Sequence, residues 1–263
     1  MEPLIITATP NNCWLHPETE FPRTLDEVVR EAKLCEEAGA SILHVHAVDW
    51  AATIDTLRQE TGLIIQCGMS SLPIPERLTV FEERADMISI IMSHHDEAFA
   101  ELDTHALHPR EELSEYAALS RQYGVRLEME TWHTGSIWNL QWLIDCGLVD
   151  PPYFTSLFFG WPGGSFTPAT IDEYLRRRAA LPASCIATVS AMGDGQPQVL
   201  AAAVVSGDHV RVGTEDRPFG RDGTPAPTHE LVVQIAELSR AYGRRIATPA
   251  EARELIGLAV EAR

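Results

Sequence analysis

The sequence predicts an α/β fold, a single-domain (β/α)8 TIM barrel over residues 1–263 with an extra helix at the C-terminal end. Eight short apolar runs alternate with eight longer segments of helical periodicity. The chain has 263 residues, and a barrel of this kind typically has about 250. The alternative, a doubly wound open sheet, usually has a glycine-rich first turn, whereas Pro10, Asn11 and Asn12 follow the first apolar run here.

The predicted elements follow one another in alternation. The predicted strands are 4–8, 41–47, 63–67, 87–92, 126–131, 153–159, 185–190 and 210–214. The predicted helices are 25–38, 54–59, 74–84, 110–123, 136–145, 168–179, 198–205 and 230–242, followed by a final helix over 248–258. Thr24 and Glu27 form a predicted capping box before the first helix. No tract rich in Ser, Gly and Pro interrupts the order, so we expect one domain.

Charge and composition argue against several classes of protein. The 20 Lys and Arg against 38 Asp and Glu give a formal charge of −18, whereas a nucleic-acid partner needs clustered basic residues. No apolar run approaches the ~20 residues of a membrane helix, and residues 1–10 lack the basic start of a signal peptide. Five scattered cysteines favour reduced thiols and a cytoplasmic location, and they are Cys13, Cys35, Cys67, Cys146 and Cys185.

Two histidines mark a candidate metal site at the end of the second predicted strand. His44 and His46 are two residues apart, so their imidazoles share one face and point into the barrel mouth, where barrel enzymes carry their chemistry. Glu215 follows the last strand, which flanks the first strand just as the second one does. Two histidines and a carboxylate leave open coordination positions, as catalytic sites do. The alternatives are solvated or core histidines, and a plain salt bridge between Arg211 and Glu215.

Glu130 and Arg211 are predicted to face the same central space. Glu130 lies near the end of the fifth predicted strand, which stands across the barrel from the first. A buried carboxylate is costly unless it is paired or functional, and Arg211 is its expected partner. A structural ion pair in the barrel core is the alternative to a catalytic role.

Loops after the strands supply candidate substrate contacts. Gly68, Ser70 and Ser93, after the third and fourth strands, are predicted to bind the substrate. The run 94–96 (His-His-Asp) is assigned to a substrate loop, because adjacent residues of an extended chain point apart and at most one of its histidines could join the metal site.

Several motifs extend over nearly the whole chain. They are AGASILHVH at 38–46, EME at 128–130, GLV at 147–149, PPYF at 151–154, GWPGG at 160–164, VRVGTED at 210–216 and ATPAEAR at 247–253. Together they resemble the motifs of the β-keto acid cleavage enzyme (BKACE) family, and VRVGTED is the most specific of them.

The resemblance implies a TIM barrel that holds a divalent metal, usually zinc, through His44, His46 and Glu215. It also implies that a small β-keto acid and acetyl-CoA react to give acetoacetate and a new acyl-CoA. A homo-oligomer, often a tetramer, is a further implication.

The same resemblance implies the catalytic groups. Asp216 would be the catalytic acid or base, steered by Arg211, with Glu130 in the supporting network. Asp216 is expected where the strand turns into the loop, free to reach the substrate carbon that loses its proton. An adjacent carboxylate can move that proton while a metal stabilises the enolate.

The segments that would contact the substrate depart from the family pattern. Val48 stands where the family usually has arginine, and the glycine-rich segment expected next is missing, which shortens the second helix. The run 67–70 (Cys-Gly-Met-Ser) replaces a Thr/Ser-Gly-Gly pattern, and 11–14 contains no glutamate. Two other hypotheses therefore stand beside the first. One is a metal-dependent aldolase or hydrolase without CoA, and the other is a non-catalytic metal-binding barrel that senses a small acid.

Overall fold

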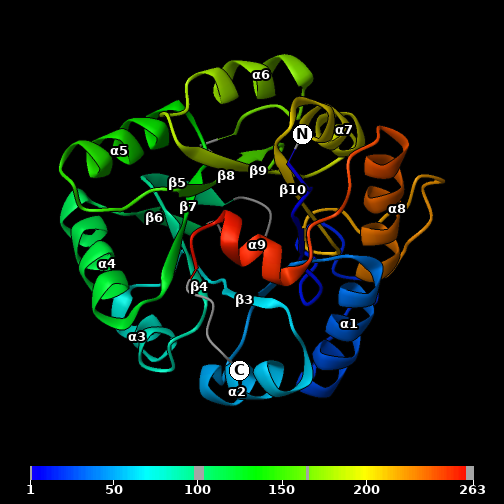
Figure 1. Ribbon diagram of the computed structural model, residues 1–263, viewed down its shortest axis with the longest axis horizontal. Coiled ribbons are helices and arrows are strands. Elements are labelled where there is room, and N and C mark those ends of the chain that lie inside the picture. Colours follow the sequence, from blue (N-terminus) through cyan, green and yellow to red (C-terminus); the bar gives the residue numbers. More distant parts are fainter. Residues whose placement is uncertain (1, 98–103, 164–165, 259–263) are drawn as a thin grey trace.

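A barrel of eight parallel strands forms the centre of the molecule, surrounded by helices (Figure 1). The structure is a computed structural model and describes residues 2–97, 104–163 and 166–258. In order around the barrel, the strands are β1 (Ile6–Ala8), β10 (His209–Val212), β9 (Cys185–Ala191), β8 (Tyr153–Phe159), β7 (Arg126–Thr131), β4 (Met87–Ile91), β3 (Ile64–Cys67) and β2 (Ile42–Val45). The predicted (β/α)8 barrel is confirmed.

The helices follow the strands in the predicted order. They are α1 (Leu25–Ala38), α2 (Trp50–Glu60), α3 (Ile74–Glu82), α4 (Arg110–Tyr123), α5 (Thr134–Asp145), α6 (Ile171–Ala179), α7 (Gln196–Ser206), α8 (Thr228–Ala241) and α9 (Pro249–Leu255). Helix α1 has the predicted bounds, since the Thr24 capping box and a left-handed Gly39 fix its two ends. Helix α2 begins earlier than predicted because the Asp49 side chain caps it. None of the helices within the described residues has the length and apolar character needed to cross a lipid bilayer.

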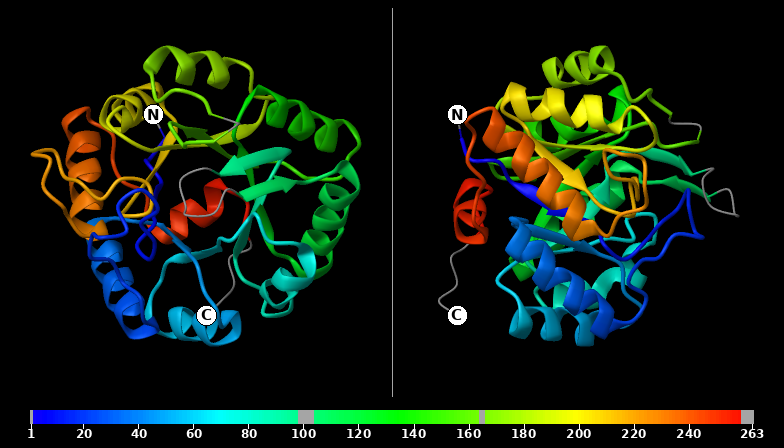
Figure 2. Two further views of the ribbon diagram at one scale, coloured as in Figure 1. Left: turned by 180° about the vertical axis from the view of Figure 1, so that it is seen from behind. Right: turned by 90° about the vertical axis from the view of Figure 1, so that its right-hand side faces the viewer.

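A two-stranded antiparallel hairpin is the main departure from the predicted fold. It pairs β5 (His94–Glu97) with β6 (Thr104–Leu107), so the assignment of 94–96 to a loop is wrong. Strand β5 consists of polar residues and lacks the apolar alternation by which a strand is recognised. The hairpin projects on the side of the barrel opposite α9 (Figure 2).

Side chains along each barrel strand alternate between two environments. Leu43, Val45, Val210 and Val212 belong to the main apolar core between strands and helices. Arg211, between the two valines of β10, lines a cavity inside the barrel mouth instead. The predicted facing of β10 is therefore confirmed.

Helix α9 closes the end of the barrel at which the strands begin. It contributes Ala252 and packs, together with Ile256, in a second apolar cluster whose other buried members are Ile5, Ile42, Ile64, Met87, Phe154 and Ala247. Figure 2 shows α9 on one side of the barrel and the long β1–α1 loop on the other. The open end is therefore the one at which the strands finish.

His209 is held in the neutral form at the start of β10. Its side chain is buried, and its Nδ1 accepts a hydrogen bond from the backbone N–H of Ile5 at 3.0 Å. Burial, helped by the charge of Arg244, lowers the pKa of His209 to about 3, whereas an unfolded histidine has a pKa of about 6.5. Between these values the unfolded chain binds more protons than the folded one, so stability falls as pH falls below about 6.5.

We expect His209→Asn to reduce the pH dependence of the free energy of unfolding. Asparagine offers an acceptor to the Ile5 N–H but does not titrate, whereas His209 contributes a slope of up to about 1.4 kcal/mol per pH unit. Urea unfolding of both proteins at about pH 7.5 and about pH 5.5 measures the difference. Equal losses of stability in the two proteins on acidification would contradict the role assigned to His209.

Candidate metal centre and active site

Three side chains from neighbouring strand ends converge at the open end of the barrel. His44 lies in β2, His46 follows β2 and Glu215 follows β10, while β1 pairs with both of these strands. The Nε2 atoms of the two histidines are 3.2 Å apart, and the Glu215 carboxylate oxygens lie 3.7 Å from His44 Nε2 and 3.5 Å from His46 Nε2. The structure thus brings together the three predicted metal ligands, with one ligand atom of each lying within 4.8 Å of the others.

Neighbouring amides orient the two imidazoles. Nδ1 of His44 donates to Oε1 of Gln66 at 2.8 Å, which leaves its Nε2 lone pair available to a cation. Burial lowers the pKa of His44 to about 3, so the ring is in the neutral form that metals bind. Asn11 bonds both to the backbone N–H of His46 and to its carbonyl, and Asn12 Nδ2 lies 3.3 Å from His46 Nδ1.

Glu215 is held as a charged carboxylate. Burial opposes its ionisation, but Arg211 and the two imidazoles outweigh burial and keep the pKa of Glu215 well below its ordinary value. Arg211 Nη2 lies 2.8 Å from Glu215 Oε1. Two imidazoles and one ionised carboxylate form a donor set that suits a catalytic zinc ion with an open position.

Gly68, directly after β3, leaves room for the two imidazoles. A Cβ at this position would lie 2.6 Å from His46 Nε2 and 2.7 Å from His44 Nε2. Gly68 is not among the residues with positive φ, so its backbone does not require glycine. The lack of a side chain therefore keeps the space around the two Nε2 atoms clear, which fits a metal ion bound there.

We expect Gly68→Ala to lower metal affinity about 10–100-fold, as the loss of a residue that orients a ligand typically does. The added methyl group displaces one or both Nε2 atoms, so titration of the metal-free protein with zinc measures the effect. Gly220→Ala is a matched control, because that Cβ would meet the flexible side chain of Gln234 at 3.0 Å, away from the site. Unchanged zinc affinity in Gly68→Ala would contradict the packing argument.

Asp216 is bound to Arg211 and does not line the cavity. Arg211 Nη2 donates to Asp216 Oδ1 at 2.8 Å, its Nε donates to the same carboxylate, and Ser190 Oγ donates to Oδ2 at 2.9 Å. Asp216 lies in the turn that follows β10, as predicted, but its side chain is 0% exposed, so the expectation that it is free to reach the substrate is wrong. Burial raises the pKa of Asp216 above its ordinary value, although Arg211 opposes this.

Glu130 has partners other than the predicted one. Its Oε2 accepts hydrogen bonds from Ser70 Oγ and Trp132 Nε1, each at 3.0 Å, whereas Arg211 pairs with the carboxylates that follow β10. The predicted pairing of Glu130 with Arg211 is therefore wrong. Both residues nevertheless line the same cavity of about 70 Å³, together with Ser70.

Ser93 and His95 lie apart from this cavity, whereas the loop after β8 contributes to it. Ser93 stands at the base of the β5–β6 hairpin, where its carbonyl accepts a hydrogen bond from the His108 N–H, and it is not among the residues that line the cavity. The ring of His95 packs on Trp132 with centroids 3.7 Å apart, behind the cavity wall. In the loop 160–164, Trp161 lines the cavity and residue 164 lies outside the described residues.

Sequence reasoning missed the aromatic walls of the cavity and the residues that orient its polar groups. The walls include Trp14, Trp132, Phe158 and Trp161. Gln66 could have been found, because it is a polar residue in an apolar run and lies in register with His44. The aromatic residues carry no such signal, since similar residues also fill ordinary cores.

Comparisons with known proteins agree with this architecture. A family model described as beta-keto acid cleavage enzyme matches residues 3–258. The 3-keto-5-aminohexanoate cleavage enzyme of Acetoanaerobium sticklandii is 31% identical over 281 residues, which cover 98% of this chain and 99% of that protein. The 3-oxoadipate:acetyl-CoA acetyltransferase of Cupriavidus necator is 28% identical, and the alignment covers 90% of this chain and 88% of that protein.

Among solved structures, the apo structure of ObcA has a TM-score of 0.74 at 15% identity, a likeness that concerns the fold alone. It covers 91% of this chain and 66% of ObcA. The family match, in contrast, extends over nearly the whole sequence, including both histidines and Glu215. The chain is therefore an enzyme of the β-keto acid cleavage enzyme family.

Proposed function

We propose that this protein uses a divalent metal ion, which we assign as zinc, to convert a β-keto acid and acetyl-CoA into acetoacetate and a new acyl-CoA. The R–CO group of the keto acid passes to the CoA sulfur, and the acetyl group replaces it on the CH₂–COO⁻ fragment, so the atoms balance. The convergence of His44, His46 and Glu215 beside Arg211 is the observation that carries the proposal. A relative named for acetyl-CoA and 3-oxoadipate supports the choice of co-substrate.

Each polar group around the small cavity has a place in this reaction. A divalent ion held by the three ligands would polarise the keto oxygen and stabilise an enolate. Glu130 and Ser70, bonded to each other, line the cavity as substrate contacts. Arg211 presents a fixed positive charge at the cavity wall. Asp216 lies behind Arg211 and is the candidate acid or base, and proton exchange tests whether it acts on the substrate or through Arg211.

Metal analysis and a substrate panel test the proposal. We expect purified protein to bind stoichiometric zinc and to form acetoacetate from several β-keto acids only when acetyl-CoA is present. Turnover without acetyl-CoA would favour a metal-dependent aldolase or hydrolase. Bound metal without turnover on any member of the panel would favour a non-catalytic sensor of a small acid.

We also propose a cytoplasmic homo-oligomer, a tetramer by resemblance to the family. The five cysteines are all free thiols in the structure, which suits a reducing compartment. Light scattering coupled to size-exclusion chromatography measures the number of subunits. A monomeric mass would contradict this assignment.

A further inference from the structure

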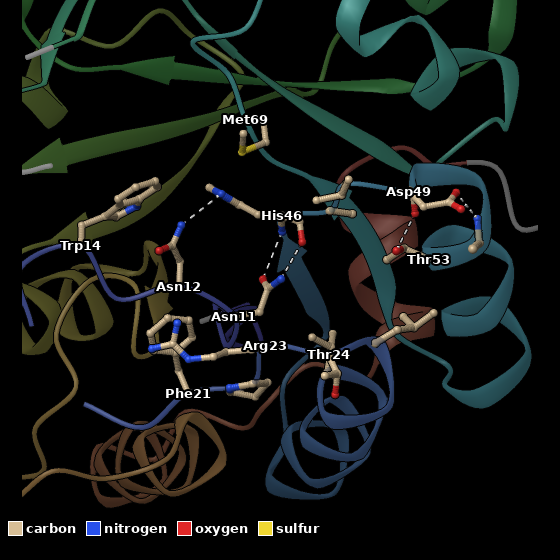
Figure 3. A pocket seen from close by; sticks show the side chains of 16 residues that line it. Asn11, Asn12, Trp14, Phe21, Arg23, Thr24, His46, Asp49, Thr53 and Met69 are labelled. Atoms are coloured by element: carbon tan, nitrogen blue, oxygen red, sulfur yellow. Dashed lines mark hydrogen bonds between the residues drawn. The ribbon is translucent and has the colours of Figure 1, made fainter. Parts of the chain in front are cut away.

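A second and larger cavity adjoins the candidate active site (Figure 3). Its volume is about 550 Å³, and it lies between the β1–α1 connection, with the start of α1, and the β2–α2 connection, with the start of α2. Trp14, His46 and Met69 line both this cavity and the small one. A ligand in the small cavity can therefore extend into the larger one past the side chain of a candidate metal ligand.

The small cavity is much smaller than the adjoining one. Its volume is about 70 Å³, against about 550 Å³ for the larger cavity. The carboxylate and keto groups of a β-keto acid use this space, so the variable group on the keto carbon must lie elsewhere. The adjoining cavity falls within the range of about 300–1,000 Å³ that is usual for ligand pockets.

The walls of the larger cavity suit an uncharged group. Its apolar lining includes Phe21, Leu25 and Val28 on one side and Ala47, Val48 and Ala52 on the other. Its two permanently charged residues are engaged with the protein itself. Arg23 lies over the Phe21 ring at 4.1 Å, and the Asp49 carboxylate accepts the Ala52 N–H at the start of α2 (Figure 3).

The nucleotide end of CoA does not match this lining. Its phosphate groups call for several cationic side chains, and Arg23 is the one arginine or lysine among the residues that line the cavity. The chain as a whole carries a formal charge of −18, which adds no general attraction for a polyanion. The acyl group of the keto acid is therefore the better occupant.

We propose that the larger cavity binds the variable group of the β-keto acid and selects a long, uncharged group, either an aliphatic chain or an aromatic ring. This inference rests on the proposed function and names its substrate class. Trp14 and Met69 form the passage between the two cavities, and Ala52 marks the wall on α2.

A series of straight-chain 3-oxo acids tests the selection in the holoenzyme. We expect kcat/KM to rise about fourfold per methylene added while the chain fills the cavity, because each buried methylene contributes about 0.8 kcal/mol. Analogues of the same length that end in an ammonium or carboxylate group are expected to be poorer substrates, because burying a charge against a mostly apolar lining is costly and the Arg23 and Asp49 side chains already contact Phe21 and the Ala52 N–H. A kcat/KM that is flat or falls along the series would overturn the inference.

Ala52→Phe tests the location of the pocket, with Ala51→Phe as the matched control. Ala52 is exposed and lines the cavity, whereas Ala51, in the same turn of α2, does not line it. We expect Ala52→Phe to lower the ratio of long-chain to short-chain kcat/KM at least tenfold, and Ala51→Phe to leave that ratio unchanged. An increase in the KM for acetyl-CoA in Ala52→Phe, with no change in chain preference, would assign the cavity to CoA and overturn the inference.

The outcomes separate this inference from the function on which it rests. Absence of acetyl-CoA-dependent turnover with every keto acid contradicts the proposed function. Turnover that is present but indifferent to chain length and to Ala52→Phe contradicts only the assignment of the pocket.

Discussion

Replacing His44 by alanine is expected to remove the bound metal and to abolish turnover while the barrel still folds. His44 supplies a neutral Nε2 within 3.7 Å of Glu215, and three protein ligands are the usual minimum for a catalytic zinc site. Metal content measured on purified protein reports the loss directly. Thermal unfolding gives a second readout, because an ion at 100 times its Kd stabilises the folded state by about 2.7 kcal/mol. Zinc should therefore raise the Tm of the unmodified protein and leave that of His44→Ala unchanged.

A histidine from the hairpin provides the matched control. His94 belongs to the other histidine-rich segment of the sequence, and its side chain is 46% exposed. His94→Ala is expected to retain stoichiometric metal and most of the activity. Stoichiometric metal in the double variant His44→Ala/His46→Ala, or its loss in His94→Ala, would show that the metal is bound elsewhere.

The barrel could be predicted because its elements obey local rules. The predicted strand ends are within two residues of those observed, because polar residues on both sides of each short apolar run mark where the strand begins and ends. Helix α1 was predicted at both ends because Thr24 and Gly39 act as caps within the sequence itself. The β5–β6 hairpin could not be predicted in this way, because its strands are short and β5 is polar.

The convergence of the three candidate metal ligands could be predicted because strand alternation and barrel closure are both regular. His44 and Arg211 face inward by alternation, and β1 places β2 and β10 on its two sides. Ion-pair partners do not follow from such rules. Arg211 and Glu130 line the same cavity, but the pairing of Arg211 with Glu215 and Asp216 depends on side-chain distances that a sequence does not contain.

Asp216→Asn is expected to keep the metal and lower kcat about 10²–10⁴-fold, the usual cost of losing a general base. The amide oxygen can still accept hydrogen bonds from Arg211, and the NH₂ group can donate to Ser190 Oγ, so the shape of the site is preserved while the proton acceptor is removed. Glu215→Gln should instead weaken metal binding, because it replaces an ionised ligand. The reverse pattern, with metal lost in Asp216→Asn and kept in Glu215→Gln, would exchange the two assignments.

Exchange of substrate protons separates a base from a positioning residue. The buried carboxylate of Asp216 contacts Arg211, which lines the cavity, so Asp216 could act on the substrate or only hold Arg211 in place. In deuterium oxide without acetyl-CoA, a general base replaces the protons of the substrate CH₂ group, which lies between the keto and carboxylate groups, by deuterium. NMR follows this exchange. We expect exchange to stop in Asp216→Asn and to continue in Ser190→Ala, which removes one hydrogen bond but keeps the carboxylate. Continued exchange in Asp216→Asn would show that Asp216 is not the base. Its role would then be to hold the Arg211 guanidinium beside Glu215, because the amide oxygen still accepts a hydrogen bond from Arg211.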